Sequence, residues 1–172
     1  MNKNYINPIK LIIAIFVIVV LVIVKIFVSS CRESVCIKPI PSFWNYTIFL
    51  DTKTATTIYP NIYLPEEMYS HYISGELSIT ESSVLLHERT HIERQGSYGP
   101  IKWLFNYIFS RKFRLNEELF AIRKQMEFLA LNGEDYDINK KASQFSSPTY
   151  LWVTTKEKAE KLLTQMWDDV VD

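Results

Sequence analysis

The chain has 172 residues, 48% of them hydrophobic, and its 19 basic and 19 acidic residues give a formal net charge of zero. This length suits one domain of ordinary size, and the apolar content with balanced charge excludes a disordered chain. The absence of excess positive charge argues against nucleic acid as a partner, and two cysteines exclude a disulfide framework or a four-cysteine zinc module.

The N-terminal region predicts a membrane segment. Every residue from 11 to 24 is apolar, and the run 9–28 comprises 20 residues with Lys10 and Lys25 near its ends. A helix of this length is about 30 Å long, which matches the hydrocarbon core of a bilayer. We therefore expect residues 1–30 to be an N-terminal signal-anchor or transmembrane segment, whose helix contacts the lipid bilayer through residues 9–28.

A cleaved segment is the alternative to a spanning helix. The residues Val28-Ser29-Ser30-Cys31 resemble a bacterial lipoprotein cleavage box, with Cys31 as the lipidated residue. Lys25 lies close before that cysteine, where such signals are normally uncharged, and the apolar run is longer than a typical signal peptide core. Cys31 and Cys36 are near enough in sequence to pair in an oxidising compartment.

The charges around the apolar run indicate its orientation. Lys3 and Lys10 precede it, and the positive-inside rule then favours a cytoplasmic N-terminus. Lys25, Arg32 and Lys38 on the other side partly oppose this orientation. We expect a single-pass membrane protein whose domain lies outside the cytoplasm.

Residues 31–43 are proline-containing and predict a linker, and residues 44–172 predict one compact domain. Alternating β-branched and aromatic residues predict short strands at the start of this domain. Capping residues and apolar periodicity predict four helices after them. The expected strands are 46–50, 57–59 and 62–64; the expected helices are 81–95 capped by Thr80, 100–110 beginning at Pro100, one from Asn116 to before Gly133, and one capped by Thr155.

The expected fold class is therefore α+β and mostly helical. A small sheet precedes the helices, and an N-terminal transmembrane helix precedes the domain. The last helix carries an apolar stripe that is most simply core packing, although its flanking lysines are also typical of an interfacial helix.

The residues with the clearest chemistry are His87-Glu88-Arg89-Thr90-His91, an H-E-x-x-H motif. On a helix, positions four apart lie on one face, so both imidazoles can bind one Zn²⁺. Glu88 is placed to take a proton from a metal-bound water. Only three histidines occur in the chain, which makes a chance match improbable; the alternative is a helix with incidental histidines.

A catalytic zinc needs a third protein ligand. The metzincin extension would require Gly at position 94 and His at 97, but the chain has Arg94 and Ser97. His71 lies upstream and is better explained as a structural or substrate-side group. A carboxylate on the third expected helix remains, and helical phase favours Glu118, at the edge of its apolar stripe, over Glu117.

These residues resemble the gluzincin branch of the zincin metallopeptidases. The motif is followed 27 residues later by Glu118-Leu119-Phe120-Ala121, and the string ending at Gln95 is similar to small bacterial and phage domains with H-E-x-x-H-x-x-x-Q. The resemblance covers roughly residues 80–131. It implies zinc bound by His87, His91 and Glu118, with Glu88 as general base. Ile122 departs from the thermolysin-type pattern, which has an acid there, so no carboxylate partner for a ligand histidine is implied.

The sequence thus predicts a membrane-anchored zinc metallopeptidase that hydrolyses a protein or peptide substrate with a zinc-activated water. A donor for the developing oxyanion is also required, and His71, Arg114 or a tyrosine could serve. The alternative is a non-catalytic membrane protein of zincin-like shape, which binds a partner or holds a structural metal.

Overall fold

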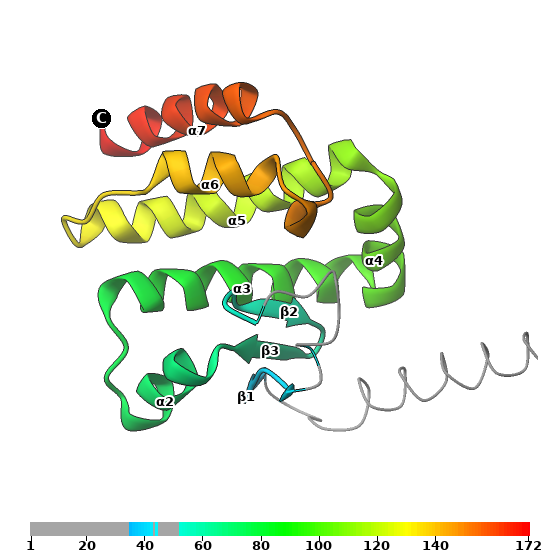
Figure 1. Ribbon diagram of the computed structural model, residues 1–172, viewed down its shortest axis with the longest axis vertical. Helices are drawn as coiled ribbons and strands as arrows, with labels where there is room; N and C mark the ends of the chain where they lie inside the picture. The colour runs from blue at the N-terminus through cyan, green and yellow to red at the C-terminus, as the bar shows by residue number, and fades with distance from the viewer. Residues whose placement is uncertain (1–34, 43, 45–51) are drawn as a thin grey trace, which may run out of the picture.

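The computed structural model describes residues 35–42, 44 and 52–172. This part of the chain is mostly helical, with one small sheet (Figure 1). The elements in chain order are β1 (Cys36–Pro39), β2 (Thr56–Ile58), β3 (Asn61–Leu64), α2 (Glu66–Ser74), α3 (Ile79–Tyr98), α4 (Pro100–Phe109), α5 (Arg111–Leu131), α6 (Ile138–Phe145), the 3-10 helix η2 (Pro148–Tyr150) and α7 (Lys156–Val171).

The expected fold class, an α+β domain behind a transmembrane helix, is wrong in its transmembrane part. Across residues 35–42, 44 and 52–172, every helix is too short or too polar to cross a membrane. α3 and α5 have 20 and 21 residues but carry many charged side chains, and the apolar α4 has only 10 residues. The apolar run 9–28, the cleavage box 28–31 and the expected strand 46–50 lie outside the described residues.

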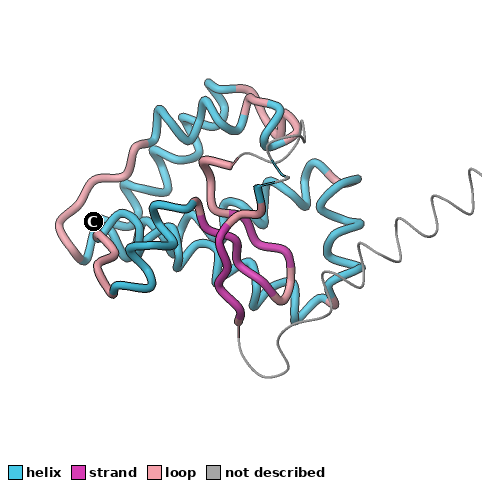
Figure 2. Tube along the Cα trace, turned by 60° about the horizontal axis from the view of Figure 1, so that its bottom comes forward, coloured by secondary structure: helices cyan, strands magenta, loops and turns pink. Residues whose placement is uncertain are grey.

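The sheet has the strand order β1-β3-β2 (Figure 2). β3 pairs in parallel with β1 and antiparallel with β2. All four residues of β3 are buried, because this central strand has a neighbour on each side and contacts α3. β1 falls within the expected linker 31–43, so part of that segment belongs to the sheet. Cys36 in β1 is disulfide-bonded; Cys31, the other cysteine of the sequence, lies outside the described residues.

Two apolar cores stabilise the domain. The first joins the sheet and α2 to one side of α3, and the second joins α5, α6 and α7. Figure 1 shows α3 and α5 running side by side between these layers, connected by α4 at one end. The first core comprises Ala55, Ile62, Leu64, Met68, Leu85 and Ile92; the second comprises Ile122, Met126, Ala142, Phe145, Tyr150, Val153, Ala159 and Leu163.

The N-termini of the helices follow the capping rules, though not always at the expected residue. Pro100 begins α4, and the Thr155 side chain accepts a hydrogen bond from the Lys158 amide at the start of α7, both as predicted. The N-cap of α3 is instead Ser78, whose hydroxyl forms a capping box with the Glu81 carboxylate. Helix α3 also continues through Gly96 to Tyr98.

Helix α5 begins six residues earlier than expected. The Ser110 hydroxyl, rather than the Asn116 side chain, accepts the capping hydrogen bond from the Phe113 amide. The two neighbouring glutamates therefore lie in the second turn of α5 and not at its N-terminus. Helices α2 and α6 were not predicted, because both are short and stabilised mainly by packing against longer elements.

Candidate metal centre

Helix α3 brings His87 and His91 together one turn apart on its buried face. Their Nε2 atoms are 3.2 Å apart, and their rings meet edge to face with centroids 4.8 Å apart. Both side chains are buried, since this face of α3 packs against α5. The motif spacing therefore has the consequence predicted from the sequence: two imidazole nitrogens converge on one point.

Helix α5 adds Glu118 to the pair. Its Oε2 is 3.6 Å from His87 Nε2, and its Oε1 is 3.5 Å from His91 Nε2. Ligand atoms that share a tetrahedral Zn²⁺ at 2.0–2.1 Å are about 3.3 Å apart, close to the separation of the two histidine nitrogens. Each carboxylate oxygen faces a different histidine, and one ligand atom from each of the three residues lies within 4.8 Å of the other two. His87, His91 and Glu118 form a buried triad that could hold a metal ion.

The hydrogen bonding of the triad supports this interpretation. Glu118 Oε2 is buried and has no hydrogen-bond partner among the described residues. Buried carboxylate oxygens are almost always paired, because leaving one unpaired costs its full desolvation free energy. A cation between the three side chains would satisfy this oxygen. Both Nδ1 atoms of the histidines also lack partners in the described part of the chain, so the site has no protein acceptor behind its imidazoles.

The electrostatics of the triad favour the protonation states that bind metals. Burial lowers the pKa of His87, which keeps its imidazole neutral. Burial by itself raises the pKa of Glu118, but His91, His87 and Lys141 outweigh this and lower it to about 2. Near neutral pH the triad therefore offers a neutral imidazole from His87 and an ionised carboxylate, as metal binding requires.

The neighbouring Glu117 has other partners. Its carboxylate accepts two hydrogen bonds from the Arg94 guanidinium, at 2.6 and 2.5 Å, and one from the Trp103 indole at 2.9 Å. Glu117 is as buried as Glu118 but is fully occupied in this ion pair. The structure thus brings Glu118, and not Glu117, to the two histidines.

Tyr107 of α4 is a site residue that the sequence analysis did not identify. Its hydroxyl donates a 2.6 Å hydrogen bond to Glu118 Oε1. This bond orients the carboxylate and does not involve Oε2, the oxygen that lacks a partner among the described residues. Burial and the nearby Glu118 charge raise the pKa of Tyr107, so its hydroxyl stays protonated and remains a donor. A tyrosine in an aromatic-rich helix carried no sequence signal for this role.

Two of the suggested oxyanion donors lie elsewhere. The Arg114 guanidinium donates to the backbone carbonyls of Tyr107 and Ile108 at the end of α4. The His71 imidazole, on α2, lies 2.8 Å from a Glu81 carboxylate oxygen at the start of α3 and is partly exposed. Neither side chain belongs to the triad.

Glu88 is held beside a cleft. Its Oε2 accepts a 2.7 Å hydrogen bond from the Thr57 hydroxyl of β2. Glu88 and His87 both line a cleft of about 800 Å³ between the sheet side of the domain and α6. His91 and Glu118 are not among the residues that line the cleft, so the triad borders the cleft through His87.

Lys141 of α6 also lines the cleft. Its ammonium donates a 2.7 Å hydrogen bond to the Tyr150 hydroxyl. Burial lowers the pKa of Lys141, and the charges of Glu118 and Glu88 act in the opposite direction, which places the ammonium within electrostatic range of both acids. The cleft is therefore lined by a carboxylate that could accept a proton, Glu88 of α3, and by a cationic donor, Lys141 of α6.

Comparison of the chain with protein-family models, curated proteins and solved structures finds no match.

Proposed function

We propose that this chain is a zinc-dependent metallopeptidase, with zinc bound by His87, His91 and Glu118. One observation carries the proposal: two imidazole nitrogens 3.2 Å apart each have an oxygen of one carboxylate within 3.6 Å, next to a glutamate that lines a cleft. Two nitrogens and one oxygen are the donor set of many catalytic zinc sites, which keep a fourth position for water.

Bound zinc would act as a Lewis acid and lower the pKa of its water towards neutrality. The residues of the chain then have distinct tasks. Glu88 accepts the proton of the attacking water and delivers it to the leaving amine, while the Thr57 hydroxyl holds its carboxylate in place. Lys141 is the cation best placed to donate a hydrogen bond to the developing oxyanion in the cleft.

The proposal is tested with the full chain after zinc reconstitution. Glu88→Gln should lower hydrolysis of an unfolded protein substrate by at least about 100-fold, because it removes the general base. It should leave stoichiometric zinc binding unchanged, whereas His91→Ala should lose both zinc and hydrolysis. Glu93→Gln is the matched control, since Glu93 is an exposed glutamate on the same helix.

Hydrolysis that survives Glu88→Gln would refute the proposed mechanism. The burial of all three ligands also fits a second candidate, a non-catalytic domain with a structural metal, because structural zinc sites are closed to solvent. Stoichiometric zinc that is indifferent to Glu88→Gln, with no hydrolysis by the wild type, would favour that candidate.

A further inference from the structure

Helix α4 exposes a continuous apolar face. Its residues at positions 101, 104, 105, 108 and 109 recur at the spacing of one helical face. On the other side of α4, Trp103 is buried and Tyr107 is half-buried. Exposed fractions along this face are 87% for Ile101, 51% for Leu104, 62% for Phe105, 47% for Ile108 and 71% for Phe109.

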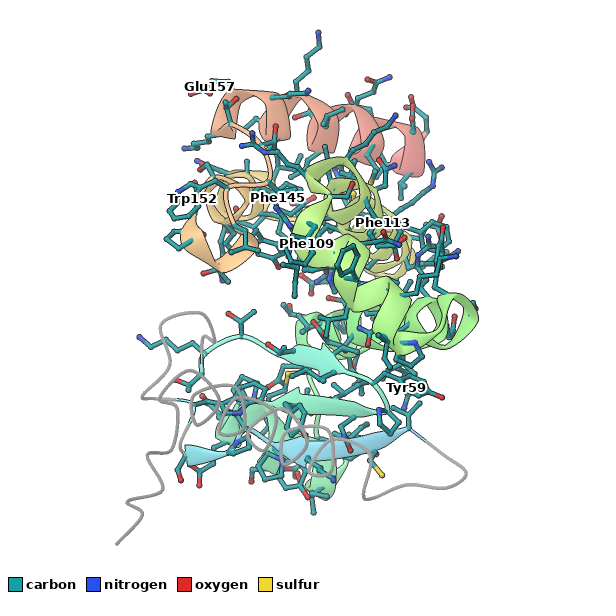
Figure 3. The ribbon with its side chains drawn as sticks, turned by 90° about the vertical axis from the view of Figure 1, so that its right-hand side faces the viewer. Tyr59, Phe109, Phe113, Phe145, Trp152 and Glu157 are labelled. Atoms are coloured by element: carbon teal, nitrogen blue, oxygen red, sulfur yellow. The ribbon has the colours of Figure 1, made fainter. Side chains whose placement is uncertain are left out.

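Such a face is unusual on a protein surface in water. Single exposed apolar residues are common, but a contiguous group of large ones marks an interaction site. Figure 3 looks onto this end of the molecule, with Phe109 near its centre. The Phe105 and Phe109 rings lie 4.6 Å apart, so they form one apolar surface.

The charged residues of α4 and of the segments next to it in sequence are all basic. The stretch 94–116 contains five basic residues and no acid, although the chain as a whole is neutral. Arg94 and Arg114 are engaged in buried contacts, whereas Lys102, Arg111 and Lys112 are exposed. An apolar face bordered by lysine and arginine complements a surface with phosphate groups above a hydrocarbon layer.

An exposed tryptophan extends this surface. The Arg111 side chain donates hydrogen bonds to the backbone carbonyls of Trp152 and Val153, which holds this loop against the start of α5. Trp152 is 54% exposed. Tryptophan is enriched at the boundary between headgroups and acyl chains, because its indole is both apolar and a hydrogen-bond donor.

We propose that α4 docks on the surface of an anionic lipid bilayer, with its apolar face in the headgroup boundary and its lysines at the lipid phosphates. A helix of 10 residues is about 15 Å long, so it lies on a bilayer and does not cross one. Exposed Lys102, Arg111 and Lys112 beside this face complement anionic headgroups in charge, and this complementarity favours lipid as the partner. The proposal is independent of the apolar run 9–28 and of catalysis.

The docking would orient the metal centre. The opposite face of α4 supplies Trp103 to Glu117 and Tyr107 to Glu118. The same short helix would therefore contact lipid on one side and the ligand-bearing helix α5 on the other. This arrangement would hold the cleft at a fixed height and angle above the bilayer.

The test uses a local probe, so that other membrane contacts of the full chain do not obscure it. A fluorophore is attached to full-length Phe105→Cys and, as the control, to Leu131→Cys. Leu131 is 87% exposed at the far end of α5, so both labels sit on the surface. Each protein is added to vesicles of phosphatidylcholine with or without phosphatidylglycerol, containing spin-labelled lipid as quencher.

We expect spin-labelled lipid to quench the label at position 105 and not the label at 131. Most of this quenching should be lost without phosphatidylglycerol, and also in a Lys102→Gln/Lys112→Gln background, because each lysine near an anionic surface strengthens binding about fivefold. Equal quenching at the two positions, or none at 105, would overturn the proposal. Protection of position 105 from aqueous iodide without lipid quenching would also overturn it, since a second copy of the chain or another protein would then cover α4.

Discussion

Two adjacent carboxylates of α5 are both buried, yet they have different partners. Glu117 forms an ion pair with Arg94 and accepts a hydrogen bond from Trp103, while Glu118 faces two histidines and has one oxygen without a hydrogen-bond partner in the described part of the chain. Removing one partner of a buried ion pair destabilises the fold because the other charge is left unpaired, whereas a buried carboxylate beside neutral imidazoles is better explained by a cation that it binds. The two residues therefore allow stability and metal binding to be separated.

Glu118→Gln should mainly affect zinc binding, and Glu117→Gln should mainly affect stability. Glu118→Gln should weaken zinc binding by more than about 100-fold, since it removes a ligand and not merely an outer partner. Glu117→Gln should leave zinc affinity nearly unchanged but lower the free energy of unfolding by about 2 kcal/mol, because it weakens the charged hydrogen bonds with Arg94 and Trp103. Chelator competition measures the affinity and urea denaturation the stability. Equal loss of zinc affinity in both variants would refute the ligand assignment.

At the scale of elements, helix ends decide how the site is assembled. α3 begins with the Ser78–Glu81 capping box, and α5 begins at Ser110 immediately after α4. α4 connects the end of α3 to the start of α5, so α3 and α5 run antiparallel and α4 lies across their ends. Polar pairs then line their interface in register, from Ser83–Gln125 through the triad to Arg94–Glu117.

The α3 cap gives a direct test of this boundary. Ser78→Ala should lower the free energy of unfolding by about 1 kcal/mol, since it removes the side chain that accepts the Glu81 amide hydrogen bond. Thr80→Ala is the matched control, because Thr80 lies inside α3 and caps nothing. Urea denaturation compares the two. A larger loss in Thr80→Ala would place the helix start where sequence alone predicted it.

The contact between α2 and α3 should depend on pH. The hydrogen bond to Glu81 raises the pKa of His71. Burial by itself raises the pKa of Glu81, but hydrogen bonds from Ser78 and His71 outweigh it and lower that pKa. Stabilisation from His71 is present below its ordinary pKa of 6.5 and is lost as pH rises through the raised value. Stabilisation from Glu81 is present above its ordinary pKa of 4.5 and is lost as pH falls through the lowered value.

The stability difference between wild type and His71→Gln should therefore be greatest between pH 4.5 and 6.5. Thermal unfolding of metal-free protein across this range measures it, and added salt should reduce it because the pair is partly exposed. A difference that stays constant to pH 9 would show that His71 acts through packing and not through charge.

In the molecule as a whole, the triad of His87, His91 and Glu118 lies between two separate cores. α3 belongs to the sheet core and α5 to the core with α6 and α7. The interface between these helices is largely polar, so it contributes less hydrophobic stabilisation than either core. A metal ion bound by residues from both helices would clamp the two halves of the domain together.

Zinc should therefore stabilise the fold cooperatively. At a free concentration roughly 100 times its Kd, a ligand that binds only the folded state raises the free energy of unfolding by about 2.7 kcal/mol. For a chain of this size the corresponding rise in Tm is roughly 5–10 °C. Calorimetry with zinc and then with chelator measures the shift. His91→Ala should abolish it and His71→Ala should not; a shift that persists in His91→Ala would place the ion elsewhere.

The local features of the fold could be predicted from the order of the amino acids. The spacing of His87 and His91 places them on one helical face, and Pro100 and Thr155 begin helices, because these effects act within a few residues. The apolar phase of residues 115–129 also indicated Glu118 over Glu117, although Asn116 was wrongly taken as the cap. Ser110 has the same capping chemistry, and sequence cannot decide between two acceptable caps.

The contacts between residues far apart in the chain depend on how the helices and the sheet pack together. Thr57 contacts Glu88 across 31 positions of the chain, and Tyr107 reaches Glu118 because α4 crosses the ends of α3 and α5. The apolar face of α4 looks in sequence like any core-facing stripe; it is exposed because no other described element covers it. Capping and periodicity are short-range and can be seen in a sequence, whereas pairing and exposure depend on how every helix packs against the rest.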